Sequence, residues 1–142
     1  MANFLSRWRF RIEWGHCDPA GSVFNSRFFE FFDWGTWTLF GRALDVKPAD
    51  LAAKFGIVGI PLIDASARFL TPARFGETVE LASRVSEFRA SSFDVEHRLI
   101  VREALAVEGR ETRMWATRDP AHPSQIRAMP VPGAVIARLG AE

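Results

Sequence analysis

Several common features are scarce or missing in this 142-residue chain. It has no tyrosine, so no phenol can act as acid, base or nucleophile, and its one cysteine, Cys17, has no partner for an intrachain disulfide. No apolar run approaches the roughly 18 residues that a membrane helix needs. Residues 1–10 carry arginines where a secretory signal needs an apolar core. These absences predict a cytoplasmic protein that does not associate with a membrane.

The charge is also close to balanced, with 18 Lys and Arg against 17 Asp and Glu. A nucleic-acid-binding protein usually has a strong basic excess, so nucleic acid is not an expected partner. Hydrophobic residues make up 48% of the chain and charged residues 25%, an ordinary composition for a folded protein. We expect residues 1–142 to form a single domain with a sizeable core.

Motifs of several enzyme classes are absent. The chain has no G-x-S-x-G nucleophile elbow, no G-x-G-x-x-G dinucleotide motif and no phosphate-binding P-loop. Its three histidines, His16, His97 and His122, have no metal-ligand spacing with one another or with Cys17. We therefore expect no metal site.

Phenylalanine and tryptophan, in contrast, are abundant, with 13 Phe and 5 Trp. About half of these rings lie between Trp14 and Phe40. A single surface helix does not carry so much apolar bulk, so this segment is either a central helix covered by other structure or part of an interface. Gly35 lies inside it, where glycine costs about 1 kcal/mol relative to alanine. We expect another backbone or a ligand to approach the helix closely there.

Patterns typical of strands and helices follow one another in a simple order. Residues 4–14 alternate between apolar and charged side chains, as in a strand with one buried face. Helical spacing runs from Asn25 to Phe40, and a short second helix spans 48–55. Extended runs and a short terminal helix follow at 57–70, 77–88, 92–103, 107–118 and 130–140. This order predicts an α+β domain with one long helix packed on an antiparallel sheet whose four later strands form a meander.

The loop before the long helix is the main candidate for chemistry. It reads GHCDPAG at residues 15–21. An Asp-Pro pair in a loop usually only forms a turn. Asp18, however, comes just before a helix N-terminus, where unpaired N–H groups and the helix dipole can stabilise a developing oxyanion. Trp14, Phe24 and Phe28 are close in sequence and can exclude water from its carboxylate.

The stretch IEWGHCDPAGSVFNSRFFEFFDWG at residues 12–35 resembles the signature of the 4-hydroxybenzoyl-CoA thioesterase family of hotdog-fold proteins. The segments FGIVGIPLI, EFRASSFDVEH and IRAMPVP, at 55–63, 87–97 and 126–132, agree with it, so the likeness covers most of the chain. The resemblance implies an antiparallel sheet wrapped around one long helix. It also implies hydrolysis of an acyl-CoA thioester with an aromatic or compact acyl group. Coenzyme A is then part of the substrate and no cofactor is expected, because a thioester is already an activated acyl group.

The resemblance further implies roles for individual residues. Asp18 matches the catalytic carboxylate, which acts as nucleophile on the thioester carbonyl or as general base on water. The backbone amide that polarises the carbonyl falls near Asn25. Family members often carry a tyrosine at this position and further basic residues where this chain has Ala90 and Ser91. The residues that match substrate-binding positions are Asp33 near the acyl pocket and, toward the coenzyme A phosphates, Arg89, Ser91, Ser92 and Arg127.

Two other interpretations stay open at this stage. One is a thioesterase for fatty acyl-CoA or acyl-carrier-protein substrates, which differs in pocket length. The other is an acyl-binding hotdog module without turnover. In each case we expect a homo-oligomer, either a dimer with a continuous sheet or a tetramer, because the apolar helix and the edge strand of a lone domain would be partly exposed.

Overall fold

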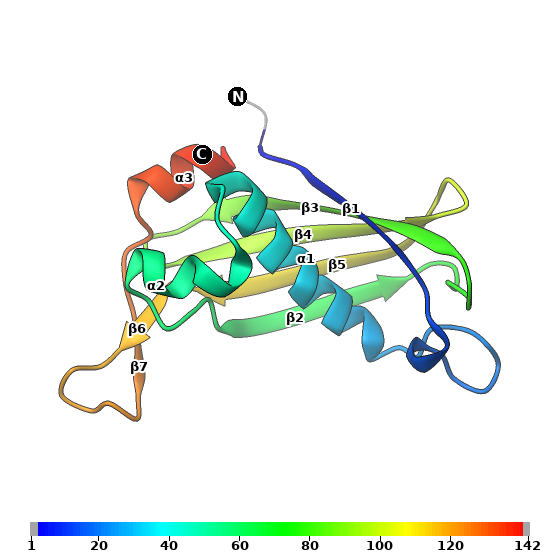
Figure 1. Cartoon of the computed structure of the whole chain (residues 1–142), viewed down its shortest axis with the longest axis horizontal. Helices are drawn as coiled ribbons and strands as arrows, with labels where there is room; N and C mark the ends of the chain where they lie inside the picture. Colours follow the sequence, from blue (N-terminus) through cyan, green and yellow to red (C-terminus); the bar gives the residue numbers. More distant parts are fainter. Residues whose placement is uncertain (1–2, 141–142) are drawn as a thin grey trace.

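The structure, a computed structural model, describes residues 3–140. One five-stranded antiparallel sheet is crossed on one face by a long helix (Figure 1). The strands are β1 (Ser6–Arg11), β2 (Leu62–Phe69), β3 (Thr78–Phe88), β4 (Ser92–Val101) and β5 (Ala104–Met114). The α-helices are α1 (Arg27–Leu44), α2 (Leu51–Phe55) and α3 (Gly133–Leu139), and single 3₁₀ turns are formed by Trp14–His16 and Pro48–Asp50. A separate two-stranded hairpin, β6 (Ala116–Arg118) and β7 (Ile126–Ala128), protrudes from one end (Figure 1).

The strand order in the sheet is β1-β3-β4-β5-β2. β3, β4 and β5 form a meander as predicted, but the expectation that β2 continues it was wrong. β2 lies at the far edge against β5, with Phe69 opposite Val107. The segment from residue 70 to residue 77 crosses from β2 to β3, a distance of roughly 14 Å for three strand spacings. Alternation within a strand reports its buried face and not its neighbour, so the pattern could not reveal this crossing.

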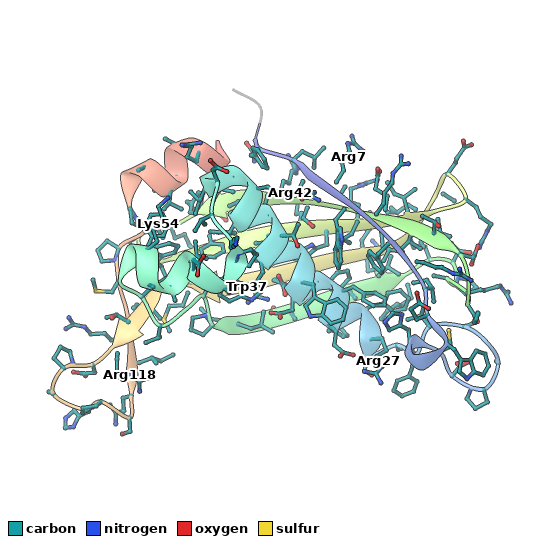
Figure 2. The ribbon with its side chains drawn as sticks, in the orientation of Figure 1. Arg7, Arg27, Trp37, Arg42, Lys54 and Arg118 are labelled. Carbon is teal, nitrogen blue, oxygen red and sulfur yellow. The ribbon has the colours of Figure 1, made fainter. Side chains whose placement is uncertain are left out.

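α1 packs its aromatic face closely against the sheet. Gly35 makes this possible, since a Cβ atom there would lie 2.5 Å from Leu81 Cδ2 and 3.1 Å from Ser83 Oγ. The expected close approach at Gly35 is therefore present, but sheet side chains make it rather than a backbone or a ligand. In the last turn of the helix, the Arg42 guanidinium donates to the Arg7 carbonyl of β1 over 2.9 Å (Figure 2).

The aromatic segment is partly core and partly surface. Phe28, Phe31, Phe32 and Phe40 are buried, whereas Trp34 keeps 46% of its surface exposed. The expectation of a covered helix is therefore met by the buried rings, and the expectation of an interface stays a prediction for the exposed ones. None of the helices in residues 3–140 has the length and apolar character that crossing a membrane requires.

Some boundaries differ from those predicted. Residues 57–61 form a loop rather than the start of a strand, and β5 begins at Ala104 rather than 107. The β4–β5 hairpin is closed by Arg102 and Glu103 alone, both with positive φ. Such a turn normally uses glycine or asparagine, so the sequence carried no signal for it. The predicted strand 107–118 is divided at Trp115, and β7 was not predicted.

Candidate active site

Asp18 lies in a tight turn before α1. Its carboxylate Oδ1 accepts a hydrogen bond from the Ala20 amide at 2.9 Å, and its own amide donates to the Ser22 carbonyl over 2.8 Å. The residue is half-buried. Among the described residues, no donor contacts its second oxygen, Oδ2. One oxygen therefore holds the turn, and the other is free for a ligand.

The same three-residue sequence occurs a second time. Asp119 is followed by proline and alanine, and its Oδ1 accepts from the Ala121 amide, also at 2.9 Å. That turn lies in the exposed β6–β7 connection, away from any helix start. The turn geometry alone is therefore not evidence of a site, and what distinguishes Asp18 is its surroundings.

Those surroundings include a pocket of about 270 Å³. It brings together Asp18 and Asn25, the two residues predicted to be catalytic, and closes against the end of β2. Its other lining residues are Ser22, Val23, Phe28, Phe69, Leu70, Thr71 and Pro72. The walls are mostly apolar, and the rings of Phe28 and Phe69 lie 5.5 Å apart.

The start of α1 supplies hydrogen-bond donors beside this pocket. The amides of Arg27 and Phe28 already donate to the carbonyls of Phe24 and Asn25. The amides of Asn25 and Ser26 have no acceptor within residues 3–140. α1 is 18 residues long, so its dipole adds partial positive charge at the same place. These groups can stabilise negative charge on an oxygen, the role that the resemblance implies for the amide near Asn25.

Asp33 lies outside the pocket, on the same helix. Eight residues separate it from Asn25, which corresponds to roughly 12 Å along a helix. Its Oδ1 accepts a hydrogen bond from Arg113 Nη2 at 2.7 Å, and its side chain is 47% exposed. Within one chain, Asp33 is therefore separated from Asp18 and held by β5.

The predicted coenzyme A turn lies at the opposite end of the sheet from Asp18. Arg89 Nη2 is 2.6 Å from Asp94 Oδ1, its Nη1 is 2.9 Å from Glu87 Oε2, and its Nε donates to Ser92 Oγ. The Ser91 carbonyl accepts from Trp115. β3, which spans 11 residues, separates this turn from the Asp18 end by roughly 35 Å.

Arg127 lies at the same end as this turn. It is exposed on β7, and the connection after β7 docks on the turn because the Val131 amide donates to the Ala90 carbonyl over 2.9 Å. Within one protomer the predicted residues thus form two distant groups: Asp18 with Asn25 at one end of the sheet, and the 89–92 turn with Arg127 at the other. Asp33 belongs to neither group.

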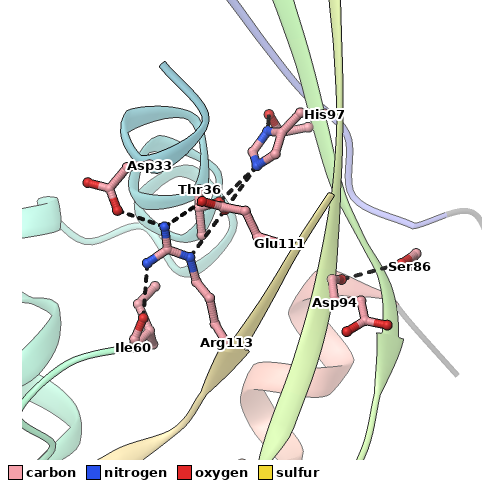
Figure 3. A network of polar contacts seen from close by, with 9 residues as sticks. Asp33, Thr36, Ile60, Ser86, Asp94, His97, Glu111 and Arg113 are labelled. Atoms are coloured by element: carbon pink, nitrogen blue, oxygen red, sulfur yellow. Dashed lines mark hydrogen bonds and ion pairs between the residues drawn. The ribbon is translucent and has the colours of Figure 1, made fainter. Parts of the chain in front are cut away.

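A buried polar network under α1 was not predicted. It joins Ser83, His97, Glu111 and Arg113 of the sheet to Thr36 and Asp33 of α1 (Figure 3). The sequence held a weak signal for it. His97 alternates with Val95 and Leu99 on the buried face of β4, and Glu111 falls on the buried face of β5 with Val107. Charged residues at buried positions need partners, but periodicity does not say which residues these are.

Three of these residues are hydrogen-bonded in the order serine, histidine, carboxylate, as in a hydrolytic triad. Ser83 Oγ is 2.7 Å from His97 Nδ1, and His97 Nε2 is 3.0 Å from Glu111 Oε1. Ser83 is only 1% exposed, and Gly35 of α1 lies directly over it. No substrate can reach this hydroxyl, so the arrangement supports the fold rather than nucleophilic catalysis.

Burial and pairing set the charges in the network. Burial lowers the pKa of His97, against the opposing effect of its hydrogen bond with Glu111. Burial alone would raise the pKa of Glu111, but hydrogen bonds from His97 and Arg113 bring it down to about 2. At neutral pH, His97 is therefore neutral and donates from Nε2, while Glu111 is a carboxylate that accepts from His97 and Arg113.

These shifts predict a loss of stability in acid. A histidine whose pKa is lowered by folding stabilises the native state above its unfolded value of 6.5, and the contribution is lost as the pH falls below that value. Glu111 adds a loss in the same direction below its ordinary 4.5. We expect the free energy of unfolding to fall between pH 7 and pH 5 by up to about 1.4 kcal/mol per pH unit, from His97 alone.

Urea unfolding at pH 7, 6 and 5 measures this slope. His97→Gln should flatten it, whereas His122→Gln, a change at an exposed histidine, should leave it unchanged. Equal slopes for His97→Gln and the unaltered protein would mean that His97 does not cause the acid loss.

Known thioesterases are similar to this chain in sequence and in fold. The 4-hydroxybenzoyl-CoA thioesterase of Pseudomonas sp. (strain CBS-3) is 27% identical over 128 residues, covering 86% of this chain and 88% of that protein. The solved structure of the 4-hydroxybenzoyl-CoA thioesterase from that strain has a TM-score of 0.84 at 26% identity, covering 96% of this chain and 99% of the other. An aspartate-to-asparagine mutant of 4-hydroxybenzoyl-CoA thioesterase in complex with 4-hydroxybenzoyl-CoA has a TM-score of 0.86 at 25% identity, with the same coverage.

The match in structure confirms the hotdog fold that the resemblance implied. The sequence model of the thioesterase-like superfamily matches residues 12–139, which includes the Asp18 turn, α1 and the whole sheet from β2 onward. The chain belongs to the thioesterase-like superfamily.

Proposed function

We propose that this chain hydrolyses an acyl-CoA thioester to the free acid and coenzyme A, with an aromatic or compact acyl group such as 4-hydroxybenzoyl. One observation carries the proposal. The pocket at the start of α1 is lined by Asp18, whose Oδ2 accepts no hydrogen bond within residues 3–140, and by Asn25, whose amide has no acceptor there. Thioester hydrolysis needs an attacking oxygen and donors for the oxyanion, and the pocket supplies both. The thioesterase relatives support the same reaction class.

Asp18 can act in two ways with the same geometry. As a nucleophile, its carboxylate adds to the thioester carbonyl, the C–S bond breaks, coenzyme A leaves as a thiolate that takes up a proton, and water hydrolyses the resulting anhydride. As a general base, it takes a proton from the water that attacks the carbonyl. In both routes the amides at the start of α1 donate to the oxyanion, which contributes about 100- to 1,000-fold in rate.

The pocket favours a compact acyl group. Its volume is about 270 Å³, and Val23, Phe28, Phe69 and Leu70 form its apolar walls. A larger hollow of about 360 Å³ lies on the outer face of the sheet, but charged side chains such as Arg98 line it, and they do not suit an acyl chain.

We propose further that the active unit is a dimer joined through β2. This strand is a sheet edge, and it exposes about half of the surface of Leu62, Ile63 and Phe69. Antiparallel pairing of β2 with its copy would continue the sheet and cover these side chains. Because the two strands run in opposite directions, the Leu62 end of one protomer would meet the Phe69 end of the other. Asp33 would then lie near the pocket that contains Asp18 of the partner subunit.

Sedimentation equilibrium at micromolar concentration tests the dimer. We expect at least twice the 16.0 kDa of one chain. Ala65→Pro in β2 should shift the protein toward the monomer. Amides alternate in direction along β2, and because the Leu70 amide donates to Ala106 next to β5, the Ala65 amide faces the free edge, where proline cannot donate a hydrogen bond across the new strand pair. Ala134→Pro is the control. It lies near the start of α3, where proline is tolerated, and it should leave the oligomeric state unchanged. A stable 16.0 kDa monomer would contradict the proposal.

Coenzyme A, with its thioester in the Asp18 pocket of one protomer, is proposed to contact the basic residues that the β2 dimer brings there from the Leu62 end of the partner subunit's sheet. Arg127 is exposed and has no ion pair among the described residues, whereas Asp94 and Glu87 already offset the charge of Arg89. Arg127 is therefore the better placed of the two for a phosphate. The hydroxyls of Ser91 and Ser92 are further candidate donors, in the turn on which the connection after β7 docks. Such rim contacts would affect KM more than kcat.

The experiment that tests the function is a hydrolysis panel. Thiol release is measured from benzoyl-, 4-hydroxybenzoyl-, phenylacetyl- and medium-chain acyl-CoA, and from the same acyl groups on pantetheine. We expect turnover of the aromatic thioesters, with a higher KM on pantetheine because it lacks the nucleotide phosphates. Preference for the medium-chain substrate would instead favour the fatty acyl alternative, and no turnover of any thioester would favour an acyl-binding module.

A further inference from the structure

Two phenylalanine rings from different elements form one wall of the pocket that contains Asp18. Phe28 lies in the first turn of α1, and Phe69 is the last residue of β2. Both line the pocket, and their ring centroids are 5.5 Å apart with the planes tilted by 52°. Rings at this separation are in contact, so an acyl group cannot pass between them. The two side chains therefore act as one continuous apolar wall.

The two rings differ in how firmly the protein holds them. Phe28 is 3% exposed, and its ring also packs edge to face against Phe31 at 5.9 Å, so the core fixes it. Phe69 is 48% exposed and reaches Phe28 from the edge of the sheet, where its strand partner is Val107. A change at Phe69 therefore alters the pocket wall and leaves the core intact, whereas a change at Phe28 disturbs the core as well.

This wall is close to the groups proposed to carry out the reaction. Phe28 follows Asn25 by one helical turn, and its amide donates to the Asn25 carbonyl. Asp18, Asn25 and both rings line the same pocket of about 270 Å³. This volume is below the roughly 300–1,000 Å³ of pockets that bury drug-sized ligands. An acyl group whose carbonyl is bound at the start of α1 thus has little room before it meets the wall.

We infer that Phe69 sets the upper limit on acyl size: its ring, supported by Phe28, admits a benzoyl-sized group and stops a long alkyl chain. A planar aromatic group packs edge to face or offset against the two rings, which is the arrangement that aromatic pairs prefer. A longer chain needs the space that the Phe69 ring occupies. The inference rests on the proposed thioesterase function and names the residue responsible for its preference for compact acyl groups.

The test uses variants that open or narrow the pocket at this one position. The value of kcat/KM is measured for butyryl-, octanoyl- and benzoyl-CoA. Phe69→Ala adds room at the sheet edge, so the octanoyl-to-benzoyl ratio should rise at least about tenfold, the smallest effect expected for one methylene group in an apolar pocket. Phe69→Trp takes up room that the benzoyl group needs, so the benzoyl-to-butyryl ratio should fall at least about tenfold.

Phe75 provides a matched control. It is also a half-exposed phenylalanine, at 43%, and its ring lies 5.4 Å from that of Trp14, but it is not among the residues that line the pocket. Phe75→Ala should leave both ratios unchanged. Sedimentation and urea unfolding show whether each variant keeps its assembly and stability. Where Phe69→Ala does not, Phe69→Leu replaces it and should raise the octanoyl-to-benzoyl ratio in the same direction.

Several results would overturn the inference. These are a preference of the unaltered protein for octanoyl-CoA, ratios that neither Phe69 variant changes, an equal loss of kcat/KM on all three thioesters, and the same shift in Phe75→Ala as in Phe69→Ala. Failure of the proposed function gives a different result, because the unaltered protein then hydrolyses none of the thioesters. Opposite shifts in Phe69→Ala and Phe69→Trp, with unchanged ratios in Phe75→Ala, support the inference.

Discussion

Replacing Asp18 with asparagine should lower kcat by at least about 100-fold on the preferred thioester, while substrate affinity changes little. The amide has nearly the same shape and keeps Oδ1 as an acceptor for the Ala20 amide, so the turn should persist. It lacks the charge that a nucleophile or base requires. The measurement is steady-state thiol release together with the dissociation constant of the product acid and coenzyme A.

The chain contains its own control for this substitution. Asp119 forms the same Asp-Pro-Ala turn, with the same 2.9 Å bond to an alanine amide, in an exposed connection. Asp119→Asn should leave kcat within about twofold. Retention of more than a tenth of kcat by Asp18→Asn would remove Asp18 from the mechanism.

A second large effect is expected at Gly109, in the middle of β5. A Cβ atom at this position would overlap the ring of Phe32, which packs from α1 onto the sheet. Both residues are in the buried part of the protein, and the Phe32 ring is also stacked on His97 at 4.9 Å. We expect Gly109→Ala to lower the free energy of unfolding by about 2–3 kcal/mol, a large value for one methyl group.

Urea unfolding measures this loss, and a second substitution tests its cause. Phe32→Leu removes the ring edge, so the double variant should lose less stability than the sum of the two single variants. Gly133→Ala is the control, because nothing lies within 4 Å of a Cβ atom there. Additive losses at Gly109 and Phe32 would show that the close contact is not the reason for the glycine.

The sequence pattern singled out Asp18 before a helix start, and the family resemblance added Asn25; the two meet in one pocket because they are close in the chain. Asp18 and Asn25 flank one turn, and the start of a helix fixes the donors between them. The resemblance placed Asp33 near the acyl pocket, but in one protomer it lies along the helix from that pocket and pairs with Arg113. Its proposed role depends on a partner subunit, and one chain's pattern does not contain that information.

The buried network shows why long-range pairing escaped prediction. His97, Glu111 and Arg113 come from two strands, and their helix partner Thr36 is 75 residues from Glu111. The alternation of apolar and polar residues along β4 correctly indicated that His97 faces the core. It could not report that four polar side chains satisfy one another under α1. The edge position of β2 was not predicted for the same reason: the connection at residues 70–77 takes the chain across the sheet, and its path is not visible in the strand pattern.

The measurement that bears most directly on the central claim is a single turnover. One equivalent of 4-hydroxybenzoyl-CoA is mixed with excess protein, and the intact thioester, free acid and coenzyme A are quantified over time. We expect the unaltered protein to convert the thioester completely, and Asp18→Asn to bind it and leave it intact over the same period. Conversion by Asp18→Asn at the unaltered rate, or an intact thioester with the unaltered protein, would contradict the proposal that this pocket hydrolyses acyl-CoA through Asp18.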